Sequence, residues 1–85
     1  MYTEEKFIMY YIAAVSSRHK CMKLYNLMRN ERIPCRIKDT PDNIVSECCL
    51  CVWFSSEDFE CVKKIIRRNG IEINGIYRDD GSKIY

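Results

Sequence analysis

Two short segments of this 85-residue chain are apolar at nearly every position. They span residues 6–14 and residues 49–54, and the second has the sequence Cys-Leu-Cys-Val-Trp-Phe. A strand with one face in water alternates apolar and polar side chains, so an unbroken apolar run of this length predicts a strand that is covered on both faces. We therefore expect both segments to be central strands of one sheet.

Turn residues separate these two strands from four further elements. The expected elements are a helix over residues 17–31, an edge-type strand over 34–39, a second helix from Ser55 to Asn69 and a last strand over 71–77. The helices are predicted from apolar residues at helical spacing and the edge strand from alternation. Ser16 or Ser17 can cap the first helix, and Ser55-x-x-Asp58 predicts a capping box at the start of the second.

The order strand-helix-strand-strand-helix-strand predicts an α+β, ferredoxin-like sandwich. In this fold four antiparallel strands lie in the order 4-1-3-2 and both helices cover one face, which places the first and third strands in the centre. These are the two segments that are apolar on both faces. We expect one domain over residues 1–78, followed by a polar tail over residues 79–85 that frays.

The sheet face opposite the helices is expected to expose apolar side chains. The first strand must turn one of two sets away from the helices, either Phe7, Met9 and Tyr11 or Ile8, Tyr10 and Ile12. A large exposed apolar patch usually marks a protein interface. We therefore predict a homodimer, or a docked partner protein, on this open face.

Chain length and charge exclude several functions. A chain this short buries only about 60–65% of the surface that its unfolded form exposes, so we expect a carrier or binding protein rather than an enzyme, unless a partner or an oligomer completes a deep pocket. The formal net charge is +2, from 14 basic and 12 acidic residues, which is too balanced to indicate a nucleic acid or an anionic membrane as partner. Tyr10, Tyr11 and Trp53 suggest base stacking, but the Lys/Arg-Gly-aromatic signature of RNA-recognition modules is missing, and nucleic acid is not expected.

Six cysteines are present, at positions 21, 35, 48, 49, 51 and 61. The chain begins with acidic residues where a secretion signal would be basic, and its apolar run over residues 7–15 is too short to span a bilayer. We therefore expect a cytoplasmic protein with reduced thiols. Free cysteines are usually buried, so about four of the six are expected to pack in the interior.

Cys48 is the cysteine that we predict to be reactive. In the expected topology, the turn between the second and third strands lies beside the end of the first strand, where the first helix begins. The N-terminus of a helix carries a partial positive charge, and Arg18 and His19 add to it. Such surroundings favour thiolate over thiol, so Arg18 and His19 are candidate stabilisers of a Cys48 thiolate.

Cys48 and Cys51 also have the spacing of a redox dithiol or of half a zinc site. A redox dithiol usually opens a helix, whereas this pair enters a strand. Both cysteines are candidate metal ligands, and a complete zinc site would need two more ligands. The chain offers Cys21, Cys35, Cys61 and His19 for these positions. Inert packing is the remaining interpretation, and no cofactor is expected.

Four motifs along the chain occur together in one known family. They are the helix start Ser16-Ser17-Arg18-His19-Lys20, the helix exit Arg32-Ile33-Pro34, the proline-containing turn from Thr40 to Cys49 and the ending Ile73-Asn74-Gly75-Ile76-Tyr77. This combination resembles the DUF3343 family of selenium/sulfur carrier-like proteins. The resemblance extends from Val15 to Tyr77.

The resemblance implies that Cys48 is the characteristic cysteine of the family. It further implies a carrier that holds sulfur or selenium on Cys48, as a persulfide in the case of sulfur, and exchanges it with donor and acceptor proteins. The family usually has Arg where this chain has Asp42 and Gly where it has Cys49. These differences remove a cation near the thiol and add a second thiol beside it. A thiol-based metal-binding or redox module and a protein-interaction domain without chemistry are the alternatives.

Overall fold

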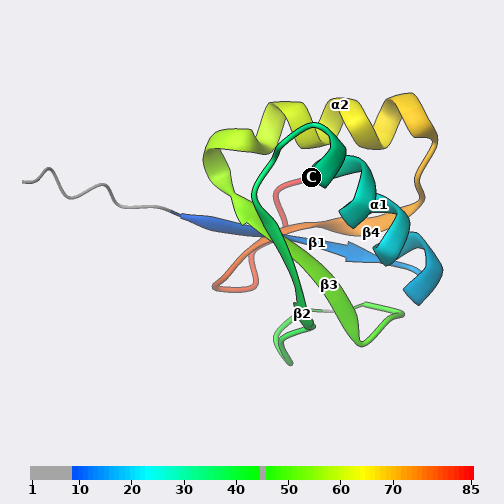
Figure 1. The fold of residues 1–85 in the computed structure, drawn as a ribbon. Helices are drawn as coiled ribbons and strands as arrows, with labels where there is room; N and C mark the ends of the chain where they lie inside the picture. Colours follow the sequence, from blue (N-terminus) through cyan, green and yellow to red (C-terminus); the bar gives the residue numbers. More distant parts are fainter. Residues whose placement is uncertain (1–8, 45) are drawn as a thin grey trace, which may run out of the picture.

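The computed structural model describes residues 9–44 and 46–85 of the chain. Its elements are β1 (Tyr10–Val15), α1 (Arg18–Asn30), β2 (Cys35–Asp39), β3 (Leu50–Ser55), the short 3-10 helix η1 (Ser56–Asp58), α2 (Phe59–Asn69) and β4 (Ile73–Arg78). The six predicted strands and helices are all present, in the predicted order (Figure 1). The first strand was expected from residue 6, and those of its expected positions that precede residue 9 lie outside the described residues.

The four strands form one antiparallel sheet in the order β2-β3-β1-β4, which confirms the ferredoxin-like arrangement. β1 lies between its two neighbours, with Ile12 paired to Trp53 of β3 and to Tyr77 of β4. Both helices cover the same face of the sheet (Figure 1). The sheet therefore has one face against the helices and one open face.

The core between helices and sheet follows from the spacing that predicted the helices. The helices bury Cys21, Leu24 and Met28 from α1 and Val62, Ile65 and Ile66 from α2. Phe54 of β3 packs among them, with 1% of its surface exposed. Ser17 caps α1 as predicted, since its hydroxyl accepts a hydrogen bond from the Lys20 backbone N–H at 3.2 Å. Neither helix of the described chain is long and apolar enough to cross a membrane.

The predicted capping box at the start of the second helix is not formed. The Ser55 hydroxyl accepts from the Glu57 backbone N–H at 3.2 Å, and this contact opens η1 rather than α2. Asp58 precedes α2 but makes no side-chain capping bond. The reason is that Ser55 still belongs to β3, so the chain needs one tight turn before α2 can begin. The other end of α2 is as predicted, with Gly70 in the left-handed conformation (φ 60°) that favours glycine.

The open face of the sheet is less exposed than predicted. It carries a second, smaller core of Ile12, Ala14, Ile44, Cys51 and Tyr77, against which Trp53 packs. Ile44, from the loop between β2 and β3, and the large ring of Tyr77 cover the centre of the face, so Ile12 has no exposed surface. Of the residues in the predicted patch, Met9 and Tyr10 are exposed, while Phe7 and Ile8 lie outside the described residues. The homodimer through this face stays a prediction.

The tail after β4 does not fray. It turns back along β4, where the Ile84 N–H donates to the Ile76 carbonyl at 2.8 Å and the Ile76 N–H donates to the Tyr85 carbonyl at 3.1 Å. The Tyr85 ring then stands edge-on to the Phe59 ring, with the ring centres 6.2 Å apart. Apolar side chains at positions 84 and 85 give the polar tail an anchor. The tail thus covers the outer edge of β4.

Candidate functional site

The loop between β2 and β3 carries Cys48 and is tied to the end of β1. The Ser46 hydroxyl lies 3.2 Å from the Val15 carbonyl oxygen, and Val15 is the last residue of β1. Ser17, the cap of α1, follows two residues later. The loop therefore sits at the end of the sheet where α1 begins.

Asn74 of β4 holds one side of this loop. Its Oδ1 accepts from the Glu47 backbone N–H at 3.1 Å and lies 3.3 Å from the Ser46 hydroxyl, while its Nδ2 donates to Glu47 Oε1 at 3.1 Å. The Ser46 hydroxyl has a single proton, which it donates to Val15 or to Asn74, and it accepts from the Cys48 backbone N–H at 3.2 Å. This network fixes the backbone that enters Cys48.

Thr40 holds the other side of the loop. Its hydroxyl donates to the Cys48 carbonyl at 3.0 Å, and its backbone N–H donates to the Cys49 carbonyl at 2.7 Å. Thr40 follows directly after the last residue of β2. The backbone of Cys48 is thus held between β2 and β4, although it belongs to neither strand.

The side chain of Cys48 is half-buried against the helix-side core. Its sulfur accepts a hydrogen bond from the Leu50 backbone N–H at 3.4 Å. An N–H donor stabilises negative charge on the atom that accepts from it. The site therefore offers a fixed, partly accessible sulfur with a donor already directed at it.

Arg18 and His19 are exposed residues in the first turn of α1. The charge of Arg18 reaches the neighbouring thiol of Cys21 and opposes the rise in the pKa of that thiol. No hydrogen bond or ion pair within the described chain joins Arg18 or His19 to Cys48. Their role as stabilisers of a Cys48 thiolate stays a prediction.

Cys51 lies on the opposite face of the sheet from Cys48. It belongs to the small open-face core, where its sulfur accepts from Trp53 Nε1 at 3.2 Å and donates toward the Lys38 carbonyl at 3.4 Å. Burial raises the pKa of the Cys51 thiol, and hydrogen bonds with Thr40 and Trp53 oppose that rise. The Cys-x-x-Cys spacing therefore does not bring two thiols to one side of the strand, as a dithiol or a metal clamp requires. Among residues 9–44 and 46–85, no group of three His, Cys, Asp or Glu side chains is placed to hold a metal ion.

Two of the remaining cysteines are buried and two are exposed. Cys21 and Cys35 are buried, and Cys49 and Cys61 are exposed. Three cysteines are thus buried, rather than the four expected. Cys61 faces solvent because the buried face of α2 is taken by Val62, Ile65 and Ile66. Cys48 is the one cysteine of the described chain with intermediate exposure.

Burial of thiols should make the fold sensitive to alkali. The pKa of the Cys21 thiol is raised from its ordinary value of 9.0 to about 11. Burial is the largest cause, and the neighbouring thiols of Cys48 and Cys51 add to it. Burial also raises the pKa of Cys35. Between pH 9.0 and about pH 11, the unfolded chain loses the Cys21 thiol proton that the folded chain keeps. The free energy of unfolding therefore falls as the pH rises through this range.

We expect Cys21 alone to lower the free energy of unfolding by roughly 2 kcal/mol between about pH 9 and pH 11. Urea unfolding in the presence of a reductant, followed by circular dichroism across this range, measures the change. The Cys21→Ala variant is the control and should show a smaller fall. Equal falls in the parent and the variant would contradict this assignment.

Sequence reasoning did not identify the residues that hold the Cys48 loop. Ser46 and Thr40 are close to Cys48 in sequence, but Asn74 comes from the last strand. One signal was present, because asparagine is uncommon inside strands and position 74 lies within β4. An asparagine at such a position indicates a side chain with a specific partner.

Comparison with known proteins gives one match. The family model described as "Putative Se/S carrier protein-like" matches residues 10–78, well over half of the chain. No curated protein and no solved structure matches the chain. The matched range runs from the first residue of β1 to the last residue of β4 and includes the whole Cys48 loop.

Proposed function

The chain belongs to the Se/S carrier protein-like family, and we propose that Cys48 is the residue that carries the sulfur or selenium atom. The observation that carries this proposal is the environment of its thiol. Cys48 alone among the six cysteines combines partial exposure with a backbone held from both sides and an N–H donor at the sulfur.

The other five cysteines suit the role less well. Cys21, Cys35 and Cys51 are buried, and burial raises the pKa of each, so they react slowly with a protein donor. Cys49 and Cys61 are exposed. A carrier must hold a reactive atom without losing it to solvent, and partial burial next to the core serves this purpose at Cys48.

The proposed chemistry is an exchange of sulfane sulfur. The Cys48 thiolate attacks the outer sulfur of a persulfide on the donor protein, a new S–S bond forms, and the donor cysteine leaves as a thiolate. Cys48 then carries a persulfide. Attack by an acceptor nucleophile on the outer sulfur transfers that sulfur and returns the Cys48 thiolate. No external oxidant or reductant is needed, and selenium follows the same steps.

The Leu50 N–H supports both halves of this exchange. It donates to the Cys48 sulfur, and that sulfur bears the negative charge before loading and again after delivery. Asn74, Ser46 and Thr40 keep the loop in place while a partner protein approaches. Cys48 lines neither the groove beside β2 nor the shallow hollow at Lys64, Arg67 and Arg68.

Mapping the loaded atom tests this proposal. The protein is incubated with a cysteine desulfurase and cysteine, digested under non-reducing conditions and analysed by mass spectrometry. We expect the added sulfur on the peptide that contains Cys48 and Cys49, with fragmentation placing it on Cys48. A selenocysteine lyase with selenocysteine provides the selenium arm. Sulfur found mainly on Cys61, or spread evenly over the exposed thiols, would contradict the proposal.

A further inference from the structure

The two outer edges of the sheet differ. The returning tail pairs with the outer edge of β4, where Tyr77 forms a bridge with Lys83. β2 lies at the other edge, and within the described chain β3 is the only strand that pairs with it. An unpaired edge presents a row of backbone N–H and C=O groups to which another strand can add.

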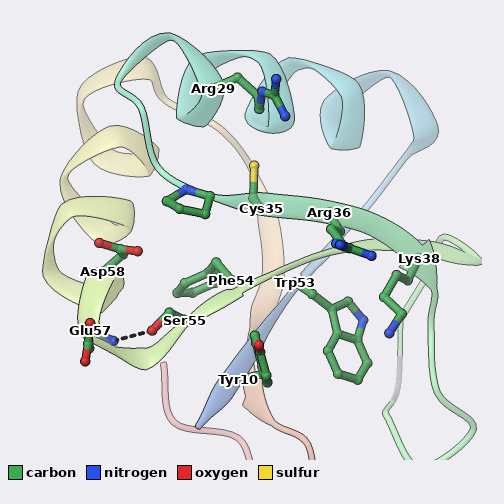
Figure 2. Close-up of a pocket in the computed structure, with 11 residues that line it drawn as sticks. Tyr10, Arg29, Cys35, Arg36, Lys38, Trp53, Phe54, Ser55, Glu57 and Asp58 are labelled. Atoms are coloured by element: carbon green, nitrogen blue, oxygen red, sulfur yellow. Dashed lines mark hydrogen bonds between the residues drawn. The ribbon is translucent and has the colours of Figure 1, made fainter. Parts of the chain in front are cut away.

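A groove lies beside β2, at the end of the sheet where β2 begins and β3 ends. It has a volume of about 850 Å³ and is lined by residues of β2 together with side chains from both sides of the sheet. Figure 2 shows Arg29 and Cys35 on the helix side of β2, and Tyr10 and Trp53 on the open-face side. Side chains of an added strand alternate between two sides, so such a strand would find room and contacts on both.

The charges along β2 select the kind of strand that can add. Arg36 and Lys38 are both exposed and share the open face, since they pair with Trp53 and Cys51 of β3. Among the residues that are paired in the four strands, none on the open face is an aspartate or a glutamate. A second copy of β2 in antiparallel register would set Arg36 against Lys38, and like charges in opposite positions destabilise a strand pair. An acidic strand would set carboxylates against both cations.

The open edge leads directly to the proposed carrier site. Asp39 ends β2 opposite Leu50, and the next residue, Thr40, bonds to the carbonyls of Cys48 and Cys49. We infer that β2 is the docking edge for an extended, acidic segment of the donor or acceptor protein, which adds as a fifth strand. The identity of that partner rests on the proposed function, whereas the binding itself does not.

An acidic peptide fits this edge better than single-stranded RNA does. Base stacking needs an open aromatic face, and the Lys38 ammonium already lies 4.3 Å from the centre of the Trp53 ring. Glu57 and Asp58 line the end of the groove next to Ser55, away from Lys38 (Figure 2). An acidic segment is therefore expected over the Arg36–Lys38 half of the groove.

Peptide binding tests the inference without any sulfur transfer. The probe is a fluorescent peptide in which glutamate alternates with valine, and its affinity is read by fluorescence anisotropy at low salt. We expect binding that weakens about tenfold in Lys38→Glu and in Arg36→Glu, because each change turns an attraction into a repulsion. Lys64→Glu, an equal charge change on exposed α2, should bind the peptide as the parent does.

Backbone pairing is separated from simple charge attraction by N-methylation. Two peptides are made, each methylated on one set of alternate amides. We expect one to lose binding and the other to keep it, since only one set of amides faces β2. Cys48→Ser should bind the peptide like the parent, so failure of sulfur loading and failure of docking are told apart.

Several outcomes would overturn the inference. A lysine-valine peptide that binds as tightly as the acidic one would remove the role of charge, and equal loss with both methylated peptides would remove strand pairing. Binding of a short single-stranded RNA in place of the peptide would assign the groove to nucleic acid. A dimer in sedimentation that dissociates in Lys38→Glu would assign the edge to a second copy of this chain.

Discussion

Replacing Cys48 with serine is expected to abolish loading of the protein with sulfur. A serine hydroxyl is a far weaker nucleophile toward sulfane sulfur than a thiolate, so we expect the Cys48→Ser variant to acquire at least about a hundredfold less sulfur than the parent. The substitution keeps the shape of a half-buried side chain, and the fold should lose less than about 1 kcal/mol of stability. Intact-mass spectrometry after incubation with a cysteine desulfurase measures the loss, and circular dichroism confirms that the variant is folded.

Two other cysteine variants are the matched controls. Cys49→Ser removes the adjacent thiol, and Cys61→Ser removes an exposed thiol on α2. Both should load like the parent, because neither holds the sulfur that accepts from Leu50 N–H. If Cys49→Ser loses loading and Cys48→Ser keeps it, the carrier is Cys49 and the assignment of the site is wrong.

Replacing Phe54 with alanine should have the largest effect on stability. Phe54 has 1% of its surface exposed, and its ring stands edge-on to Tyr11 with the ring centres 6.1 Å apart. Truncation of a buried phenylalanine removes apolar contacts and leaves a cavity, at a cost of about 3–5 kcal/mol. A domain of this size has about 5–10 kcal/mol in total, so the variant should unfold at a much lower urea concentration.

Tyr10→Ala is the control for that measurement. Tyr10 is also an aromatic residue of a central strand, but it lies on the open face with 47% of its surface exposed. We expect its removal to cost less than about 1 kcal/mol. Equal losses in the two variants would contradict the exposure of Tyr10 on the open face, and a larger loss in Tyr10→Ala would mean that the two faces have been assigned the wrong way round.

Much of the fold could be predicted because local patterns and topology agree. The apolar spacing of α1 and α2 defines their buried faces, and Ser17 and Gly70 mark two helix ends by their own conformational preferences. The two segments with no polar face had to be central strands. These two central strands, together with the order of the six elements, predict the ferredoxin-like sandwich.

Some features could not be predicted because they depend on distant contacts. A segment that is apolar on both faces does not reveal which residues face the helices, so the burial of Ile12 beneath Ile44 and Tyr77 was missed. The polar composition of the tail hid its pairing with β4, in which backbone groups rather than side chains form the hydrogen bonds. The capping box failed because β3 extends into its first residue.

The sequence by itself determined the strand order, the helices, the family motifs and the choice of Cys48 as the residue of interest. Only the tertiary structure decided how that residue is held. It placed Asn74 of the last strand against the Cys48 loop and turned Cys51 to the opposite face, where Trp53 binds its sulfur. The physical reason is that elements form from local preferences, whereas a site forms where separate elements satisfy one another's polar groups.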